Sequence, residues 1–215
     1  MKSITSQCFL GEGPLWIARL GCFFWVDIEK GNLHRYHLAT EQLEIRHFPH
    51  RLAVVLEGQI GKLILGLDRK LVRYDWETEE IEELCEVESD LILNRFNDGK
   101  VDPKGRIWIG TLSTLFTEGA GSLYRIGPDL QPKVQLTNLT ISNGMAWTAD
   151  QQTFYFIDTP TKKIQEFAFD PKTGAIEFRR IAVEIPEGLG FPDGMSIDRE
   201  GMLWVAHYAG SGVYC

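Results

Sequence analysis

The sequence repeats itself, and this repeat limits the possible folds more than any other feature of the chain. Four segments share one layout: a polar residue precedes a glycine, an apolar run follows, and a polar turn leads to a second segment rich in aromatic residues. A degenerate fifth copy lies between the first two. A period near 45 residues with several strands per unit is typical of a β-propeller. The marking glycines are spaced 45, 41, 45 and 50 residues apart: Gly13, Gly58, Gly99, Gly144 and Gly194.

Short segments in the four clear copies have the composition of β-strands. Residues 23–27, 107–111, 154–158 and 203–207 are aromatic or β-branched and are bounded by turn residues. We find no convincing amphipathic helix. Residues 77–88 have a faintly helical spacing, but we favour an outer strand and turn of a blade. The tryptophans recur at equivalent places, so we expect them to pack the blades rather than to stack on sugars.

The 215 residues correspond to four or five blades at about 45 residues each. We expect one all-β domain, 1–215, with a large core, because 44% of the residues are hydrophobic. The net charge of −8 disfavours duplex nucleic acid and anionic membranes as partners. No apolar run could span a membrane, and the N-terminal segment lacks the features of a secretory signal. Four widely spaced cysteines favour reduced thiols in a cytoplasmic protein.

One polar position recurs in the repeats. The residue before the marking glycine is Glu12, Asp98, Asn143 or Asp193 in the four clear copies. Equivalent positions of successive blades face one central channel, so these side chains could surround a single point. Oxygen ligands suit calcium, magnesium or manganese, and carboxylates also bind zinc. The alternative is that the Asx-Gly pairs form turns in which the side chain caps local backbone, and the spacing alone leaves both open.

Two further residues precede Asp98. Arg95 and Asn97 could hold a polyhydroxylated substrate near a metal, or they could be a surface arginine and a loop asparagine. His207 ends a predicted strand, where it either reaches the rim of the channel or packs like an aromatic residue. The chain has no P-loop, no GxGxxG and no GxSxG motif.

The remaining histidines form two HxxH patterns, His34–His37 and His47–His50. Both patterns lie in strand and turn sequence, where residues three positions apart face opposite sides of the pleat. We therefore do not expect a histidine metal site.

Four motifs, in order, resemble those of the senescence marker protein / gluconolactonase / luciferin-regenerating family, the regucalcin-like proteins. The motifs are LGEGPLW, RFNDGKVDPKGRIWIGT, ISNGMAW, and PDGMSID followed by LWVA. The resemblance implies a six-bladed propeller with one divalent metal in the central channel. It implies metal ligands at Glu12, Asn143 and Asp193, and substrate contacts at Arg95 and Asn97.

The resemblance also implies two departures from the family. Its members are longer, so this chain is expected to lack the end of the fifth blade and the sixth. Residues 113–120 occupy the place of a loop over the cavity mouth that supplies an acidic substrate contact. Glu118 is the only acid in this segment and is the candidate for that contact.

Together, the resemblance and the site chemistry imply metal-assisted hydrolysis of a sugar lactone to an aldonic acid. The metal, calcium or zinc first and magnesium or manganese next, would act as a Lewis acid. Asp193 would take a proton from the attacking water. The alternatives are hydrolysis of another lactone, an ester or an organophosphate, a non-catalytic calcium-binding protein, or a truncated chain without a function. The oligomeric state is left open.

Overall fold

The computed structural model describes residues 4–59 and 61–215, so the first three residues of the N-terminal segment lie outside it. The all-β prediction is confirmed, because helical structure there consists of two 3-10 turns, η1 (Ala18–Leu20) and η2 (Thr159–Thr161). None of the helices in the described ranges is long and apolar enough to cross a membrane. The strands are β1 (Gly11–Ile17), β2 (Cys22–Asp27), β3 (Asn32–His37), β4 (Gln42–His47), β5 (Leu52–Glu57), β6 (Lys62–Leu67), β7 (Lys70–Asp75), β8 (Ile81–Glu86), β9 (Asn94–Val101), β10 (Ile107–Ser113), β11 (Gly121–Ile126), β12 (Pro132–Leu139), β13 (Ser142–Trp147), β14 (Thr153–Asp158), β15 (Lys163–Phe169), β16 (Ile176–Glu184), β17 (Phe191–Ile197), β18 (Leu203–Tyr208) and β19 (Gly212–Tyr214).

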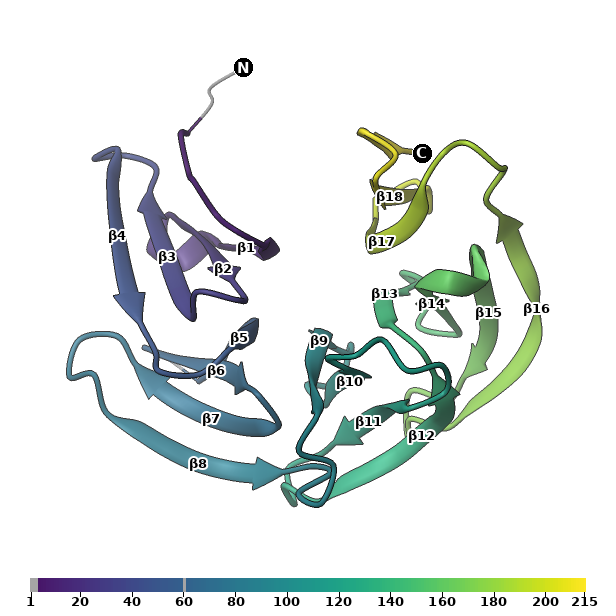
Figure 1. Cartoon of the computed structure of the whole chain (residues 1–215), viewed down its shortest axis with the longest axis horizontal. Coiled ribbons are helices and arrows are strands. Elements are labelled where there is room, and N and C mark those ends of the chain that lie inside the picture. Colours follow the sequence, from purple (N-terminus) through teal and green to yellow (C-terminus); the bar gives the residue numbers. More distant parts are fainter. Residues whose placement is uncertain (1–3, 60) are drawn as a thin grey trace. The chain divides into compact units, whose positions relative to one another are not determined.

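The described strands form five sheets that follow one another along the chain. Each sheet takes its strands in sequence order, four in the first four sheets and three in the last (Figure 1). This is the blade arrangement of a β-propeller, with one blade for each sequence repeat. The four predicted strands are β2, β10, β14 and β18, the second strand of their sheets, and residues 77–88 contain the outer strand β8. These strand predictions are confirmed.

The chain divides into two compact units, Met1–Leu84 and Cys85–Cys215. The first unit holds β1 to β7 and the beginning of β8. The second holds the three sheets that start with β9, β13 and β17. In this second unit the first strands of the sheets are neighbours, with β13 between β9 and β17 (Figure 1). The polar positions of three repeats are thereby brought into one region.

Aromatic side chains fill the space between the first two sheets of the second unit. Trp108 is fully buried and meets Trp147 edge-on, with ring centroids 5.7 Å apart. The indole Nε1 of Trp108 also donates a 3.0 Å hydrogen bond to Asp102 in the preceding turn. These two tryptophans pack the blades, as predicted. The cluster consists of Trp108, Leu123, Leu139, Met145, Trp147, Phe154, Phe156, Phe167 and Phe169.

Candidate functional site

A β-bulge interrupts the first strand of each sheet, at the place where the sequence repeats its polar residue. The pairing shifts register beside Glu12 in β1, beside Asn143 in β13 and at Asp193 in β17. In β9 the shift leaves Asn97 and Asp98 outside the pairing with β10. A bulge inserts an unpaired residue and redirects the neighbouring side chains. The repeated residues are therefore carried on bulged strand backbone.

The second sheet explains the degenerate repeat. Its first strand is bulged at Ala53, between Leu52 and Val54, and this stretch of β5 is buried and apolar. We assigned Gly58 as the marking glycine of this copy, but Gly58 follows the end of β5. That assignment is wrong, because the bulge here contains no glycine and no polar residue that would mark it in the sequence.

Asn143 and Asp193 meet in the second unit. The amide Nδ2 of Asn143 donates a hydrogen bond to Oδ1 of Asp193 and a second, of 3.1 Å, to Oγ1 of Thr159. Oδ1 of Asn143 accepts from the backbone N–H of Gly144 at 3.1 Å. Asn143 is buried and Asp193 is half-buried. Two of the three predicted metal ligands are thus adjacent.

Thr159 is a member of this group that sequence reasoning missed. Its hydroxyl donates a 2.9 Å hydrogen bond to the carbonyl of Pro192, next to Asp193, while it accepts from Asn143. It lies in the 3-10 turn η2 after β14, outside the repeated motif. The hydroxyl hydrogen of Thr159 is used in the bond to Pro192, so its oxygen can only accept a hydrogen bond from Asn143. The Nδ2 end of the Asn143 amide, and not its oxygen, must therefore face Thr159.

The environment of Asp193 disfavours a charged carboxylate. Burial raises the pKa of Asp193, and hydrogen bonds from the Asn143 amide and the Gly194 backbone oppose this rise. Both donors are neutral. A partly buried carboxylate stabilised only by neutral donors is suited to binding a cation or to accepting a proton.

Asp98 and Lys100 place a second pair of charged groups beside this site. Burial raises the pKa of Asp98 and lowers the pKa of Lys100, and each is opposed by the charge of the other. The Nζ atom of Lys100 donates to the backbone carbonyl of Met195. Lys100 thus links β9 to β17 two residues beyond Asp193. Sequence reasoning missed Lys100, because β9 also carries Arg95 and Asp98 and a third charge there gives no distinct signal.

Arg95 and Asn97 contact each other in β9. Nη1 of Arg95 donates to the carbonyl of Phe96 at 2.8 Å and to Oδ1 of Asn97 at 3.1 Å. Nδ2 of Asn97 in turn donates to the carbonyl of Ser142 at 3.0 Å, so Asn97 is joined to the strand that carries Asn143. Arg95 is buried rather than a surface residue. The structure therefore brings Asn97 next to the Asn143–Asp193 pair, with Arg95 behind it.

Two further site residues were predicted, Glu12 and Glu118. Glu12 belongs to the first unit, where it is half-buried at the bulge of β1. Glu118 is exposed in the loop between β10 and β11. The next residue, Gly119, donates its N–H to Oγ1 of Thr140, which places this loop near the start of β13. No hydrogen bond or ion pair joins Glu118 to Asn97 or Asp193 in the described residues.

His207 is a packed residue of the third sheet in this unit. Its Nδ1 lies 2.7 Å from the carbonyl of Leu189, and its ring stacks on Tyr214 at 4.3 Å. In the antiparallel pairing of β17 with β18, His207 lies opposite Pro192. Asp158 has the same place in the neighbouring sheet, where it lies opposite Ser142 in the pairing of β13 with β14. Asp158 accepts hydrogen bonds from the backbone that leads into β13, so both residues anchor the approach to the first strand. The packed-residue interpretation of His207 is confirmed.

The HxxH histidines have separate partners in the first unit. His34 stacks on Trp25, His47 lies 3.1 Å from Oδ1 of Asn32, and His50 lies 3.0 Å from Oδ2 of Asp68. Within the described ranges, no group of three or more His, Cys, Asp or Glu side chains is placed to hold a metal.

The donor chemistry at Asn143 and Asp193 fits a hard divalent cation. Both side chains carry oxygen atoms, and the Asp193 carboxylate has no cationic partner among its described hydrogen bonds. In the structure the Asn143 amide directs Nδ2 to Asp193 and Oδ1 to the N–H of Gly144, so Oδ1 is the atom that a cation would take over. Within the second unit the pair supplies one carboxylate and one amide. A complete ligand set therefore needs further oxygen atoms.

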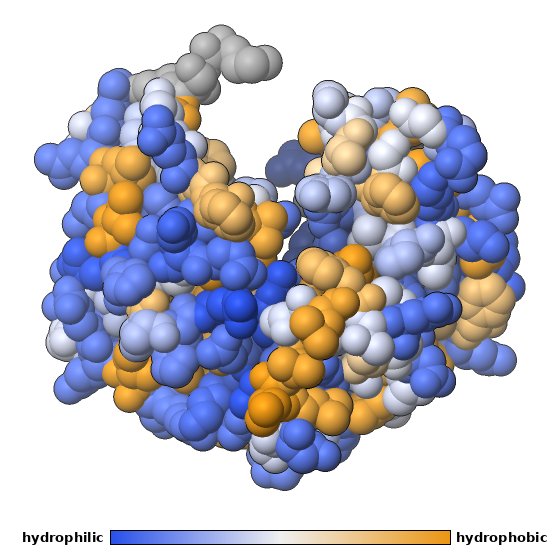
Figure 2. Space-filling view, viewed as in Figure 1, coloured by the Kyte–Doolittle hydropathy of each residue, from blue (hydrophilic) through white to orange (hydrophobic). Residues whose placement is uncertain are grey.

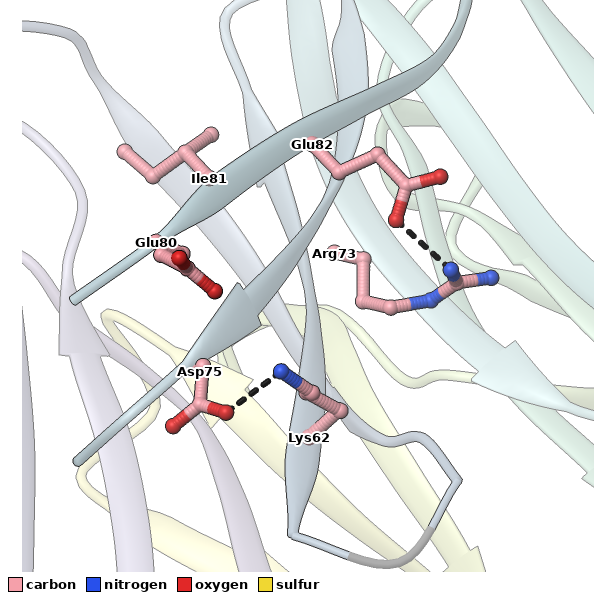
Figure 3. Close-up of a pocket in the computed structure, with 6 residues that line it drawn as sticks. All are labelled: Lys62, Arg73, Asp75, Glu80, Ile81 and Glu82. Atoms are coloured by element: carbon pink, nitrogen blue, oxygen red, sulfur yellow. Dashed lines mark hydrogen bonds and ion pairs between the residues drawn. The ribbon is translucent and has the colours of Figure 1, made fainter. Parts of the chain in front are cut away.

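The first unit contains a hollow of a different character (Figure 3). It lies between β6, β7 and β8. Here Nζ of Lys62 donates to the carboxylate of Asp75, and Nη1 of Arg73 donates to Oε2 of Glu82 at 2.6 Å. Four of the charged residues that line it form these two ion pairs across the strands, and Glu80 is a fifth lining charge. These ion pairs join neighbouring strands and do not converge on a common point.

The sequence profile of the family described as SMP-30/Gluconolactonase/LRE-like region matches residues 10–215. The chain belongs to this family. Regucalcin of Xenopus laevis is 34% identical over 224 residues, covering 99% of this chain and 75% of that protein. Pentonolactonase XacC of Haloferax volcanii is 35% identical over 209 residues, covering 97% of this chain and 70% of that protein.

A solved structure confirms the regucalcin-like propeller fold. Regucalcin from Agrobacterium tumefaciens, described as a calcium-binding protein, matches with a TM-score of 0.92 at 29% identity. The match covers 97% of this chain and 70% of that one. The described part of this SMP-30 family chain contains five blades, and six remains the number implied by the resemblance.

Proposed function

We propose that this chain is a divalent-metal-dependent lactone hydrolase. The observation that carries the proposal is the contact between Asn143 and Asp193, which joins two repeats at their bulges and leaves a carboxylate with neutral donors only. The family, which is named for gluconolactonase, and the similarity to a pentonolactonase support hydrolysis of a cyclic ester. Sugar lactones are the first substrate class to test.

We propose that Glu12, Asn143 and Asp193 hold the cation. A bound divalent cation would polarise the lactone carbonyl and stabilise the charge that develops on its oxygen. Calcium and zinc are the first candidates and magnesium and manganese the next, because all accept oxygen ligands. Thr159 would keep accepting from Nδ2 of Asn143, so that Oδ1, which accepts from the Gly144 N–H in the structure, is the atom left for the cation.

Asp193 would act as the general base. It takes a proton from water as the water oxygen adds to the carbonyl carbon, and the proton passes to the ring oxygen when the ring C–O bond breaks. Its carboxylate, which only neutral groups hydrogen bond in the structure, would accept this proton from the water. Arg95, Asn97 and Glu118 would contact the substrate. Asn97 is the best placed of the three, because it adjoins β13.

We further propose that both units belong to a single propeller domain that acts in the cytoplasm. The four cysteines are free thiols, which fits a reducing compartment. A non-catalytic calcium-binding protein is the second candidate, because the Agrobacterium relative is described as calcium-binding. In that case Glu12, Asn143 and Asp193 would still bind calcium, but the protein would hydrolyse no substrate.

The test is proton release from gluconolactone and pentonolactones above the spontaneous rate, first with chelator and then with each divalent cation. The proposal predicts hydrolysis that chelator abolishes and one cation restores. Asn143→Ala should lose this activity, while Gln131→Ala, an exposed amide on a turn, should keep it. Tight calcium binding without turnover of any lactone would favour the second candidate instead.

A further inference from the structure

Two loops of the second unit expose large apolar side chains side by side. One leads into β9 and the other follows β10, and Figure 2 shows an orange ridge over these segments in the lower middle of the face. Between 45% and 77% of each side chain is exposed to solvent. We call this set the apolar rim: Leu91, Ile92, Leu93, Leu115 and Phe116.

Backbone hydrogen bonds hold the apolar rim in place. Both the N–H and the hydroxyl of Thr114 donate to the carbonyl of Leu93, at 2.8 and 2.9 Å, so the two loops are fastened together. The N–H of Phe116 donates to Ser113 at 2.7 Å, and Phe116 has a φ of 53°. A left-handed conformation is unusual for a bulky residue. The loop keeps Phe116 exposed although its backbone is strained.

Exposed loops seldom carry so much apolar surface. Large side chains gathered in a continuous exposed patch mark a binding surface more often than chance. Polar residues are the usual choice in such turns, and the exposed rim side chains gain little from packing in the core. We therefore expect the apolar rim to be covered when a ligand binds.

The rim adjoins the residues proposed to contact substrate. Leu93 lies two positions before Arg95, and Ser113, which begins the second loop, pairs with Asn94 across β9 and β10. Asn97 follows Leu93 by four residues, in the middle of β9, and is hydrogen bonded to the strand of Asn143. A ligand whose polar part reaches Asn97 would place an attached chain near the apolar rim.

We infer that the preferred substrates are lactones with an aliphatic chain, whose ring ester reaches the Asn143–Asp193 site while the chain covers the apolar rim. This inference rests on the proposed lactone hydrolysis. A fully hydroxylated sugar lactone offers no apolar surface to the rim. A second copy of the chain is a poorer occupant, because five side chains fall well short of the roughly 20–30 residues a side that a stable dimer interface uses.

The experiment measures kcat/KM for γ-lactones whose alkyl chain is lengthened one methylene at a time, with gluconolactone as the reference. Each methylene that covers the rim should raise kcat/KM about fourfold, the equivalent of ~0.8 kcal/mol, until the chain extends beyond it. Ile92→Ser and Phe116→Ser should flatten this increase and leave gluconolactone hydrolysis unchanged. Phe178→Ser, which changes a side chain of β16 that is 54% exposed, is the control on an exposed aromatic residue outside the rim.

Each remaining outcome overturns the inference in a distinguishable way. Hydrolysis of gluconolactone with no dependence on chain length contradicts the aliphatic preference and leaves the lactonase proposal standing. Failure to hydrolyse any lactone contradicts both. A dimer in light scattering that Ile92→Ser dissociates, with chain-length dependence absent, identifies the rim as a self-association surface instead.

Discussion

Asn143 and Asp193 are 50 residues apart in the sequence, and a direct hydrogen bond between their side chains defines the candidate site. The repeat register was sufficient to predict that these two residues share one region. It could not predict Thr159, which orients the Asn143 amide from a turn outside the repeated motif. At the residue scale, the repeat identifies the candidate metal ligands, and tertiary packing brings in residues such as Thr159 that orient them.

Lys100 is a positioning residue of this kind. Lys100→Met leaves the Met195 carbonyl without its donor and Asp98 without its neighbouring positive charge. We expect the free energy of unfolding to fall by about 1–3 kcal/mol, since buried polar groups lose their partners. Urea unfolding measures this.

Two controls separate the role of Lys100 from a general effect of removing a lysine. Lys104→Met, on an exposed turn, should change stability by less than about 0.5 kcal/mol. Adding Asp98→Asn to Lys100→Met should recover part of the loss, because no unpaired buried charge is then left. Equal effects of the two lysine changes would contradict the positioning role.

At the scale of elements, the bulge of β13 is packed against the bulge of β17. A Cβ atom on Gly144 would lie 2.6 Å from Cδ1 of Ile157 and 2.7 Å from the carbonyl oxygen of Asp193. Gly194 holds the equivalent place after Asp193, and a Cβ atom there would meet nothing within 4 Å. The two glycines occupy the same repeat position with opposite steric demands.

Gly144→Ala should therefore be destabilising and Gly194→Ala should not. The first forces β13 and β17 apart, which we expect to lower the free energy of unfolding by about 1–3 kcal/mol and to weaken metal binding. The second should stay within about 0.5 kcal/mol of the original chain. Denaturant unfolding and calorimetric metal titration test the pair. Similar losses in both variants would show that the glycines serve local backbone conformation rather than contact between the strands.

The elements themselves were largely predictable. Strands such as β2 and β14 are rich in aromatic and β-branched residues and lie between clear turns, and this local composition favours strands. The register of the second sheet was not predictable, because Ala53 at its bulge carries no polar or glycine signal. Lys100 was missed for a related reason: its partner is a backbone carbonyl 95 residues away, which no sequence pattern marks.

At the scale of the whole molecule, the metal proposal includes Glu12, a residue of the first unit. This carboxylate sits at the bulge of β1, at the repeat position that Asn143 occupies in β13. If it binds the same cation, Glu12→Gln should weaken metal affinity by at least about tenfold, as Asn143→Ala should. Calorimetric titration with calcium and zinc measures both variants.

The matched control for Glu12 is Glu118→Gln. Glu118 is exposed and is proposed to contact substrate, not metal, so its loss should leave metal affinity unchanged. An unchanged metal affinity in Glu12→Gln, with a large loss in Asn143→Ala, would place the metal within the second unit alone. The single-domain interpretation would then lose its main functional support.

The measurement that tests the central claim most directly is kcat for lactone hydrolysis by Asp193→Asn. It is made at metal and substrate concentrations that titration shows to be saturating for the variant, with Glu200→Gln, an exposed acid, as control. The account predicts a loss of about 10²–10⁴ in kcat for Asp193→Asn and none for the control. A loss smaller than about tenfold would contradict the assignment of Asp193 as the general base.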